Sequence, residues 1–482
     1  MTYEGRTTTY GAMQWRVTRL AHALRGLGVE RGSRVAYLGG NHPAFLESLF
    51  AVAALGAVFV PLNARLSAAE IDFMLDDSGA GVLIFGGGSL TTVEHLDAMT
   101  RRPLVAVEES TLGALDYSRM IADAPDGPVD VRIDLDDPCM IMYTSGTTGR
   151  PKGAILSHNN IMWNCINVLV DLDLASDEVT LVTAPMFHTA ALNMTCMPTL
   201  LKGGHLVIES RFDAAAVIDT IERLRVTLLF GVPTMFMALT QSPRWSTADL
   251  SSLRRLLCGG APVPTSLINT YLERGISFVQ GYGMTETAPG ALMVDPQLSR
   301  ETIGAAGVAH FFTDVLLLRD DGSVAGPGEP GEVVIAGPNV MQGYWGVQEA
   351  TEGAFIDRRW FRSGDVGIAD DQGVITIIDR LKDVYISGGE NVYPAEVEKV
   401  LCDHGAVAEA AVIGVGDATW GEVGKAFVVL VAGGSATEDE LIAHLRNRLA
   451  GYKIPQSLVL RDSLPRTASG KVSKSQLRTE RT

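Results

Sequence analysis

The sequence predicts an α/β protein with a large N-terminal domain and a small α+β domain at its C-terminal end. The chain has 482 residues, too many for one ordinary hydrophobic core. Helical and strand patterns alternate past residue 280, and from about residue 300 short strands are separated by turn sequences. We therefore expect a large domain over residues 1–380, in which 300–380 form a β-rich subdomain, and a second domain over 381–482.

The first element is a helix, and buried strands follow it. Leu20, Leu24 and Leu27 continue a helical spacing that starts at Trp15, and Gly28 fits the helix end. The apolar run from Ser48 to Leu62 is shorter than the roughly 20 residues of a membrane span, so we expect a buried helix that leads into a strand. Further strands are expected at 34–38, 81–85, 181–184, 205–208, 227–230 and 277–280.

The later elements have other patterns. Short strands are predicted at 315–319, 332–335 and 374–379, with turn sequences such as Asp320-Asp321-Gly322 between them. Pro394 suits the first turn of a helix. Thr437 and Glu440 form a capping-box pattern ahead of another helix. With strands around 410–415 and 426–431, these helices indicate a small α+β domain.

Composition limits the partners and the compartment. The net charge of −17 argues against broad attraction to nucleic acid or anionic membranes. The five cysteines stand far apart without paired spacing, which is typical of a reducing compartment and not of a zinc site or a disulfide framework. No export signal opens the chain. We therefore expect a cytoplasmic protein without a transmembrane segment.

A loop rich in glycine and hydroxyl residues is the strongest chemical signal. The run Tyr143-Thr144-Ser145-Gly146-Thr147-Thr148-Gly149-Arg150-Pro151-Lys152-Gly153 follows an apolar stretch that can form a strand. Its backbone can wrap closely around an anion, and Lys152 adds a local positive charge. It is not a Walker A loop, because Pro151 replaces the glycine that precedes the lysine there. A flexible turn without function is the alternative interpretation.

This loop resembles the phosphate-binding signature of the acyl-CoA synthetase, adenylation-domain and luciferase superfamily. Four other segments resemble further signatures of that superfamily, in its order and spacing: Gly281-Tyr282-Gly283-Met284-Thr285-Glu286, Arg362-Ser363-Gly364-Asp365, Asp379-Arg380-Leu381-Lys382-Asp383 and Pro465-Arg466-Thr467-Ala468-Ser469-Gly470-Lys471. The resemblance implies sheet layers in the large domain, a β-barrel-like subdomain and a mobile C-terminal domain.

The resemblance also implies roles in nucleotide binding. The segment from Thr144 to Lys152 would hold the triphosphate of ATP. Thr285 and Glu286 would lie beside the α-phosphate, with Glu286 a ligand of Mg²⁺, which prefers oxygen donors. The remaining nucleotide contacts would come from Gly260 and Ala261, from Gly281, Tyr282 and Gly283 beside the adenine, from Asp365 at the ribose hydroxyls, and from Arg380.

Three further assignments imply a reaction in two steps. Lys471 matches the catalytic lysine of the adenylation step. Lys382 matches the hinge position of the superfamily. Gly388 and Gly389 match a loop that lines the thiol tunnel after the small domain has rotated. The small domain would then offer Lys471 first and the glycine loop second.

The acid substrate is indicated less directly. His188, in Pro185-Met186-Phe187-His188, matches a gate between acyl pocket and thiol tunnel, and it stands where amino-acid-activating members carry an acidic residue. The expected pocket walls are apolar and small: 188–194, 230–235 and 259–262. This part of the sequence resembles bacterial feruloyl-CoA synthetases and coumarate–CoA ligases. Medium- or long-chain fatty acyl-CoA synthetases are the alternative.

The sequence therefore predicts an AMP-forming acid–CoA ligase that uses ATP, Mg²⁺ and CoA, as a monomer or a homodimer. A nucleotide-binding regulator without turnover is disfavoured, because Lys471 and Glu286 are both present. A nicotinamide dehydrogenase is disfavoured too, because Gly281-Tyr282-Gly283 lacks the third glycine of the dinucleotide fingerprint.

Overall fold

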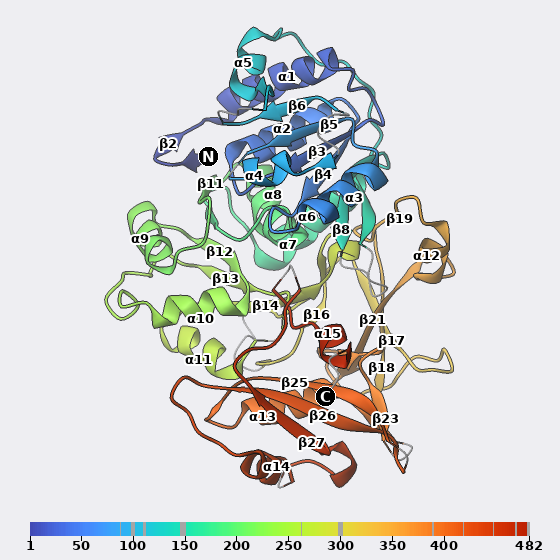
Figure 1. Cartoon of the computed structure of the whole chain (residues 1–482). Helices are drawn as coiled ribbons and strands as arrows, with labels where there is room; N and C mark the ends of the chain where they lie inside the picture. The colour runs from blue at the N-terminus through green and yellow to red at the C-terminus, as the bar shows by residue number, and fades with distance from the viewer. Residues whose placement is uncertain are drawn as a thin grey trace. The chain divides into compact units, whose positions relative to one another are not determined.

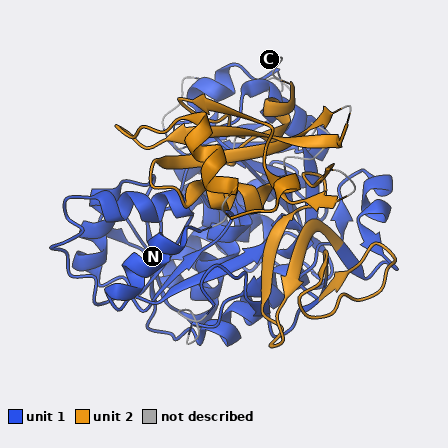
Figure 2. Cartoon of the chain, turned by 90° about the horizontal axis from the view of Figure 1, so that it is seen from below, with its two compact units in different colours: residues 1–315, 335–361 blue, residues 316–334, 362–482 orange. Residues whose placement is uncertain are grey.

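The computed structural model describes most of the chain in two compact units (Figures 1 and 2). Unit 1 comprises residues 1–315 and 335–361, and unit 2 comprises 316–334 and 362–482. The boundary at residue 380 that the sequence suggests stays a prediction. The described residues are 1–86, 88–97, 102–108, 112–144, 151–261, 263–296, 302–387, 390–417, 419–446, 448–467 and 470–479.

Unit 1 contains an eight-stranded sheet within the described residues. Its strands follow the order β19-β9-β8-β4-β3-β5-β6-β7, and those from β8 to β7 are parallel. The bounds are β3 Arg34–Leu38, β4 Val58–Leu62, β5 Val82–Phe85, β6 Leu104–Ala106, β7 Leu115–Asp116, β8 Pro138–Thr144, β9 Lys152–Ser157 and β19 Gly343–Tyr344. The side chains of β3, β4, β5 and β6 are mostly apolar and buried, as expected for a parallel sheet covered on both faces.

A second sheet of unit 1 joins nine strands of the described chain in the order β16-β15-β14-β13-β12-β10-β11-β1-β2. The run from β14 to β1 is parallel. The bounds are β1 Thr2–Tyr3, β2 Arg6–Thr7, β10 Val179–Val182, β11 His205–Ile208, β12 Leu228–Gly231, β13 Arg255–Cys258, β14 Phe278–Gly283, β15 Gly290–Met293 and β16 Val308–Ala309.

Several helices of unit 1 begin directly after a residue that caps them. Thr9 caps α1 through its side chain, and Ser67 and Glu70 form a reciprocal capping box at α3. The bounds are α1 Tyr10–Gly26, α2 Pro43–Ala54, α3 Ala68–Ser78, α4 Leu90–Glu94, α5 Tyr117–Asp123, α6 His158–Leu172, α7 Thr189–Ala191, the π-helix η2 Leu192–Cys196, α8 Met197–Lys202, α9 Ala214–Leu224, α10 Pro233–Gln241, α11 Thr265–Glu273, the 3₁₀ helix η3 Thr285–Thr287 and α12 Gln348–Gly353.

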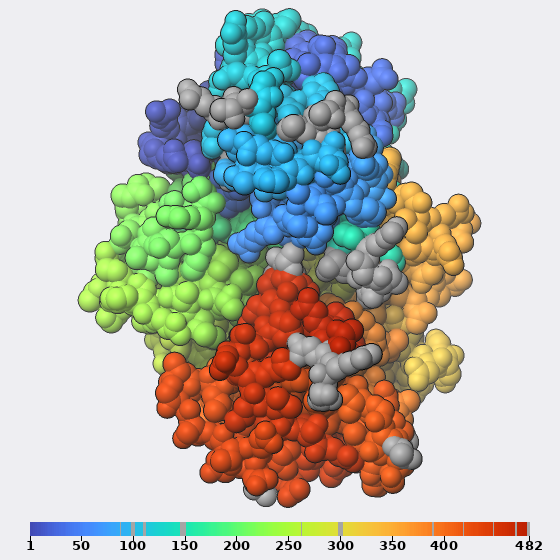
Figure 3. Space-filling model, in the orientation of Figure 1, coloured from blue at the N-terminus to red at the C-terminus, as the bar shows by residue number. Residues whose placement is uncertain are grey.

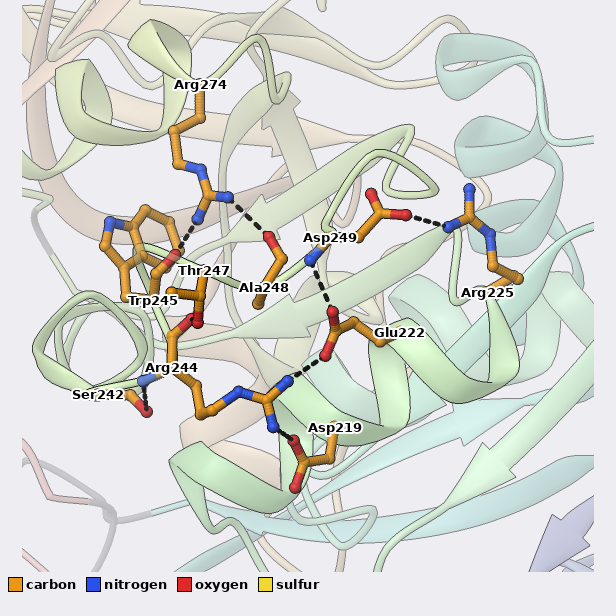
Figure 4. Close-up of polar contacts among 10 residues, drawn as sticks. All are labelled: Asp219, Glu222, Arg225, Ser242, Arg244, Trp245, Thr247, Ala248, Asp249 and Arg274. Atoms are coloured by element: carbon orange, nitrogen blue, oxygen red, sulfur yellow. Dashed lines mark hydrogen bonds and ion pairs between the residues drawn. The ribbon is translucent and has the colours of Figure 1, made fainter.

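The segment that precedes β13 is held by polar contacts. Figure 4 shows Arg244 pointing to Asp219 and Glu222, both on α9. Glu222 also accepts a hydrogen bond from the backbone N–H of Asp249 at 2.8 Å. Helices α9, α10 and α11 form the green surface at the left of Figure 3. These contacts fix the approach to β13, whose carboxyl end carries Gly260.

Five strands of the described residues form another sheet in the order β17-β18-β21-β20, with β22 paired to β21. Its strands are β17 Asp314–Leu318, β18 Pro330–Ala336, β20 Phe355–Ile356, β21 Trp360–Ala369 and β22 Ile375–Arg380. Unit 2 also has the sheet β24-β23-β26-β25 with β27 on β26, within the described residues. Its elements are β23 Tyr385–Ser387, β24 Glu390–Val392, α13 Pro394–Cys402, β25 Val407–Asp417, β26 Gly421–Leu430, α14 Glu438–Arg446, η4 Gly451–Lys453, β27 Ser457–Arg461 and α15 Lys474–Thr479.

The structure confirms the predicted fold class. The run Ser48–Leu62 is the end of α2 followed by β4, almost all buried. Thr437 and Glu440 exchange the two hydrogen bonds of a capping box, at 2.8 and 3.2 Å. Trp15, however, is 46% exposed, so it does not join Leu20 and Leu24 on the buried face of α1. Arg19 lies over its ring instead, 4.7 Å from the ring centroid.

Candidate functional site

Four strands of the nine-stranded sheet bring predicted site residues to one edge. The strands β10, β12, β13 and β14 are parallel, so their carboxyl ends lie together (Figure 1). His188 follows β10, Gly260 and Ala261 follow β13, and Gly281 to Gly283 end β14. In open α/β sheets, ligands bind at the carboxyl ends of the strands. This edge of unit 1 is therefore the first part of the candidate site.

The glycines at this edge let the backbone segments approach closely. A Cβ atom at Gly259 would lie 3.0 Å from the carbonyl oxygen of Gly281 on the neighbouring strand. At Gly283 it would lie only 1.7 Å from the carbonyl oxygen of Pro289, next to a register shift in the pairing of β14 with β15. Gly260 has a φ of +83°, which favours glycine. Side chains at Gly259 and Gly283 would force apart the strands that position Thr285 and Glu286.

The predicted phosphate-binding loop joins β8 to β9, which are antiparallel. Thr144 at the end of β8 pairs with Lys152 at the start of β9. The hydroxyl of Thr144 donates a hydrogen bond to the carbonyl oxygen of Lys152 at 3.4 Å. A Cβ at Gly153 would lie 2.5 Å from the Cγ2 of Ile141, so this position requires glycine. The predicted residues Ser145, Gly146, Thr147 and Thr148 lie outside the described residues.

Tyr344 contacts both Glu286 and Lys152, two residues of the predicted phosphate site. Its hydroxyl donates a hydrogen bond to Glu286 Oε1 at 2.9 Å. The Nζ of Lys152 lies 5.3 Å from the centroid of the Tyr344 ring. Strand β19, which carries Tyr344, pairs with β9, which carries Lys152. A cation, an aromatic ring and a carboxylate that are distant in sequence are thus neighbours.

Glu286 is buried and held through its backbone as well. Only 9% of the residue is exposed, and its carbonyl oxygen accepts a hydrogen bond from the N–H of Met341 at 2.8 Å. Burial, together with the nearby Glu286 carboxylate, raises the pKa of Tyr344. The tyrosine therefore stays a neutral donor to the carboxylate. The following residue Thr287 is fully buried, and its carbonyl oxygen accepts from Asn339 at 2.9 Å.

The loop that carries His188 is held by a buried asparagine. The Oδ1 of Asn41 accepts from the N–H of Met186 at 2.9 Å, and its Nδ2 donates to the carbonyl oxygen of Ala184 at 3.0 Å. His188 occupies the N-cap position of α7, and its ring centroid lies 4.8 Å from that of Phe187. Asn41 thus sets the backbone path from β10 to His188.

The predicted walls of the acid pocket contribute to one apolar cluster. Ala191, Met194 and Phe230 belong to it, and Met235 packs against it. Asn193 lies between these residues in sequence, on a π-helical turn, and is fully buried. Within the described part of the chain, neither its Nδ2 nor its Oδ1 has a hydrogen-bond partner. Such an orphaned amide is costly, and π-helical turns are frequent at functional sites.

In unit 2, Asp365 and Arg380 face each other across two paired strands. They are directly opposite in the pairing of β21 with β22, and Arg380 Nε lies 3.2 Å from Asp365 Oδ1. Asp365 is buried, whereas the arginine side chain is half exposed. Gly364 has a φ of +69°, and the N–H of Asp365 donates to the Ser363 hydroxyl at 3.0 Å. This turn presents the carboxylate beside a cation.

Lys471 lies on a tight turn near the end of the described chain. Arg466 and Val472 pair as an isolated antiparallel bridge, and the N–H of Thr467 donates to the carbonyl oxygen of Lys471 at 2.7 Å. Gly470 has a φ of +84°. A hairpin of this kind limits the positions that the lysine can take.

Lys382 lies two residues after the end of β22, where the sequence predicts a hinge. Burial lowers its pKa, with Arg380 acting in the same direction. The preceding Asp379 is buried: its carboxylate accepts from the N–H groups of Arg380 at 2.7 Å and of Ala395, in the first turn of α13, at 2.8 Å. Burial raises the pKa of Asp379 to about 6. Gly388 and Gly389 lie outside the described residues.

Sequence reasoning missed three polar residues of this region: Tyr344, Asn41 and Asn193. Tyr344 had a faint signal, since it stands between Gly343 and Trp345 in a segment rich in glycine and aromatics. No local sequence signal pointed to Asn41 or Asn193. The partners of Asn41 are distant in the chain, and the lack of partners at Asn193 is a result of folding.

The described residues contain neither a ready-made cluster of metal ligands nor a membrane-spanning helix. No group of three or more potential metal ligands is found among them. In the same part of the chain, no helix is long and apolar enough to cross a membrane.

The sequence model described as AMP-binding enzyme matches residues 1–345. A second, described as AMP-binding enzyme C-terminal domain, matches residues 396–471. The chain therefore belongs to the AMP-binding enzyme family, and the superfamily predicted from the motifs is confirmed.

Curated relatives extend over nearly the whole chain. Feruloyl-CoA synthases from Amycolatopsis sp and Streptomyces sp are 55% identical over 474 residues, which cover 98% of this chain and 94% of each relative. A long-chain-fatty-acid–CoA ligase from Mycobacterium tuberculosis is 38% identical over 98% of this chain and 92% of its own length. The solved o-succinylbenzoate CoA synthetase from Bacillus subtilis, with its acyl-adenylate intermediate, has a TM-score of 0.88 at 34% identity, covering 99% of this chain and 95% of that one.

Proposed function

We propose that the chain is an AMP-forming acid–CoA ligase whose acid is a hydroxycinnamate such as ferulate, coumarate or caffeate. The acid and ATP give an acyl-adenylate and pyrophosphate, and CoA then gives the thioester and AMP. The supporting observation is the 55% identity to two feruloyl-CoA synthases along 98% of the chain, against 38% to a fatty acyl ligase over the same share. A fatty acyl-CoA synthetase stays the alternative.

The first step needs charge neutralised at the α-phosphate. A carboxylate is a poor electrophile, so adenylation supplies it with a leaving group, and negative charge develops on the phosphate oxygens. Thr144, the loop after it and Lys152 hold the triphosphate, and Thr285 binds beside the α-phosphate. The ring of Tyr344 limits the positions of the Lys152 ammonium, which lies 5.3 Å away. The cation is therefore directed before ATP arrives.

Glu286 suits a magnesium ion. The ion is hard, prefers oxygen ligands and is usually bound by one or two carboxylates together with substrate phosphates. The carboxylate of Glu286 is buried, and the hydrogen bond from Tyr344 fixes its orientation. Glu286 would hold Mg²⁺, which when bound supplies positive charge to the ATP phosphates. Tyr344 acts through Glu286 as a positioning residue.

Further predicted residues would bind the nucleoside part of ATP. The segment Gly281 to Gly283 and the pair Gly260 and Ala261 contact the adenine side. Asp365 accepts hydrogen bonds from the ribose hydroxyls, and charge-assisted bonds of this kind contribute about 1.5–3 kcal/mol each. Arg380, whose Nε lies 3.2 Å from Asp365 Oδ1, contacts the nucleotide as well.

The residues of unit 2 take turns in the two half-reactions. Lys471 stabilises the transition state of adenylation. Rotation about Lys382 then replaces it with the loop of Gly388 and Gly389, which lines the path of the CoA thiol. This order follows from the chemistry, since the thiol can attack only once the adenylate exists.

The acid binds where the pocket walls meet Asn193. The aromatic ring of a hydroxycinnamate lies against Ala191, Met194 and Phe230, while His188 gates the carboxylate end. The buried amide of Asn193 has no partner among the described residues, so a ring oxygen of the acid can satisfy it. A fatty acid would leave this amide unsatisfied. That difference favours a phenolic acid.

The cell compartment follows from the proposed reaction. All five cysteines are free thiols, and four of them are buried. Unpaired cysteines suit a reducing environment that also supplies ATP and CoA. The enzyme therefore acts in the cytoplasm.

The test is AMP formation with ATP, Mg²⁺ and CoA against ferulate, coumarate, caffeate, cinnamate, benzoate, octanoate and palmitate. Preference for ferulate or coumarate supports the proposal. Preference for octanoate or palmitate would retain the mechanism and replace the substrate. Absence of AMP with every acid would refute the ligase assignment.

Asn193→Leu tests how the acid is chosen. The variant should lower kcat/KM for ferulate about tenfold and leave cinnamate, which has no ring oxygen, nearly unchanged, because one hydrogen bond to the substrate is lost. Cys196→Ala is the matched control, since it changes the same helical turn at a residue outside the expected pocket walls. Equal losses for ferulate and cinnamate would refute the role of Asn193.

A further inference from the structure

The last helix of unit 2 is joined to the rest of that unit by two ion pairs. Lys474 Nζ lies 2.7 Å from Glu398 Oε1 on α13, and Arg478 Nη2 lies 2.9 Å from Asp383 Oδ1. The same Oε1 of Glu398 accepts a hydrogen bond from the N–H of Val412 at 2.7 Å. Helix α15 is thus bound to two different segments of unit 2.

The same helix is the nearest support of the Lys471 turn. Only Val472 and Ser473 separate Lys471 from α15, and the N–H of Ser473 donates to the carbonyl oxygen of Pro465 at 2.8 Å, across the turn. Leu477 of α15 is buried in a small apolar cluster against which Val472 packs. A shift of α15 would therefore move the turn that carries Lys471.

Asp383 is the residue directly after Lys382. Its N–H donates to the carbonyl oxygen of Arg380 at 2.9 Å, which closes the turn after β22. The Asp383 side chain is only 10% exposed, and that of Arg478 is 36% exposed. A carboxylate with so little access to water is stabilised by a charged partner, so the pair is more than a surface contact.

We propose that Arg478 is a positioning residue that couples the hinge to the catalytic lysine. Its bond to Asp383 fixes α15 to the first residue after Lys382, so a rotation at the hinge carries the Lys471 turn with it as one body. Without the bond, α15 is held on one side only, and Lys471 reaches the α-phosphate in fewer of the molecules. This inference rests on the proposed roles of Lys471 and Lys382.

The experiment compares the two half-reactions in the full-length protein. Arg478→Ala should lower kcat for acid-dependent pyrophosphate exchange at least about tenfold, with KM for ATP and acid unchanged, because a small misplacement of a reacting group is that costly. Thioester formation from preformed acyl-adenylate should stay within about twofold of the wild type, since it does not use Lys471. Lys453→Ala is the control: it breaks a pair with Glu396 on α13 and leaves both ion pairs of α15 in place.

Two further variants separate positioning from loss of folding. Arg478→Lys keeps the charge and should recover most of the exchange rate, whereas Asp383→Asn should reproduce the loss. Unchanged exchange in Arg478→Ala and Asp383→Asn would overturn the inference, as would equal losses in both half-reactions. Lys471→Ala is measured in parallel: if it exchanges pyrophosphate normally, the proposed function of Lys471 has failed, and not only its coupling to Arg478.

Discussion

The two units hold their proposed catalytic groups in different ways. In unit 1, Glu286 is buried, lies between two strands of one sheet and is fixed by a hydrogen bond from Tyr344. In unit 2, Lys471 lies on a short turn whose supports include the ion pairs Arg466–Glu409 and Arg478–Asp383. The first arrangement is rigid because a sheet and close packing set it. The second depends on side chains, so one substitution can alter it without unfolding the protein.

The largest loss of activity should come from removing the charged amino group of Lys471. Lys471→Ala should lower acid-dependent pyrophosphate exchange roughly 10²–10³-fold, the scale for losing one transition-state donor. Its thermal stability should match the wild type, because the turn is closed by backbone hydrogen bonds that do not involve the ammonium. Normal exchange in this variant would refute the assignment of Lys471.

In the rigid region, a change in packing should reduce stability. Gly283→Ala places a Cβ 1.7 Å from the carbonyl oxygen of Pro289, so the free energy of unfolding should fall by about 3 kcal/mol or more. Gly353→Ala, at the end of α12 with open space around the new methyl group, is the control and should be neutral or slightly stabilising. Urea denaturation of both proteins measures the difference. Equal stabilities would show that unit 1 is less rigid than we infer.

The stability of the segment around Asp379, next to the predicted hinge at Lys382, should depend on pH. Its pKa is about 6 when folded, against an ordinary value of about 4, so the folded state binds the proton more tightly. The stability that protonated Asp379 contributes is complete below pH 4 and is lost as pH rises through 6, by up to about 3 kcal/mol. Relative to Asp379→Asn, which cannot titrate at this position, the wild type should therefore lose stability as pH rises from 4.5 to 7.5. Hydrogen exchange of the α13 amides measures it, and a constant difference would contradict the prediction.

The smallest effect should come from removing the hydrogen bond that Tyr344 donates to Glu286. Tyr344→Phe removes one hydrogen bond to a charged group, so kcat for pyrophosphate exchange should fall about tenfold, and more Mg²⁺ should be needed for half-maximal rate. Tyr10→Phe is the control, because it removes a hydrogen bond to the Gly204 carbonyl oxygen that does not involve a predicted site residue. An unchanged magnesium requirement would show that Tyr344 does not position Glu286.

Local sequence patterns were enough to predict most elements of the fold. The helix and strand in Ser48–Leu62, the helix that starts at Pro394 and the capping box at Thr437 are all found where expected. These features depend on neighbours a few residues apart, which a single sequence displays. Trp15 lies in α1 as its spacing predicts, but its 46% exposure is decided by packing, which the spacing does not record.

The sequence by itself determined the family, the reaction class and the residues proposed to carry it, because each motif is a short run whose chemistry is local. Only the tertiary structure decided what holds those residues in place. Tyr344 meets Glu286 across 58 positions, Asn41 meets Met186 across 145, and Arg478 meets Asp383 across 95. No local pattern records such pairs, because chain folding alone brings them within hydrogen-bond distance.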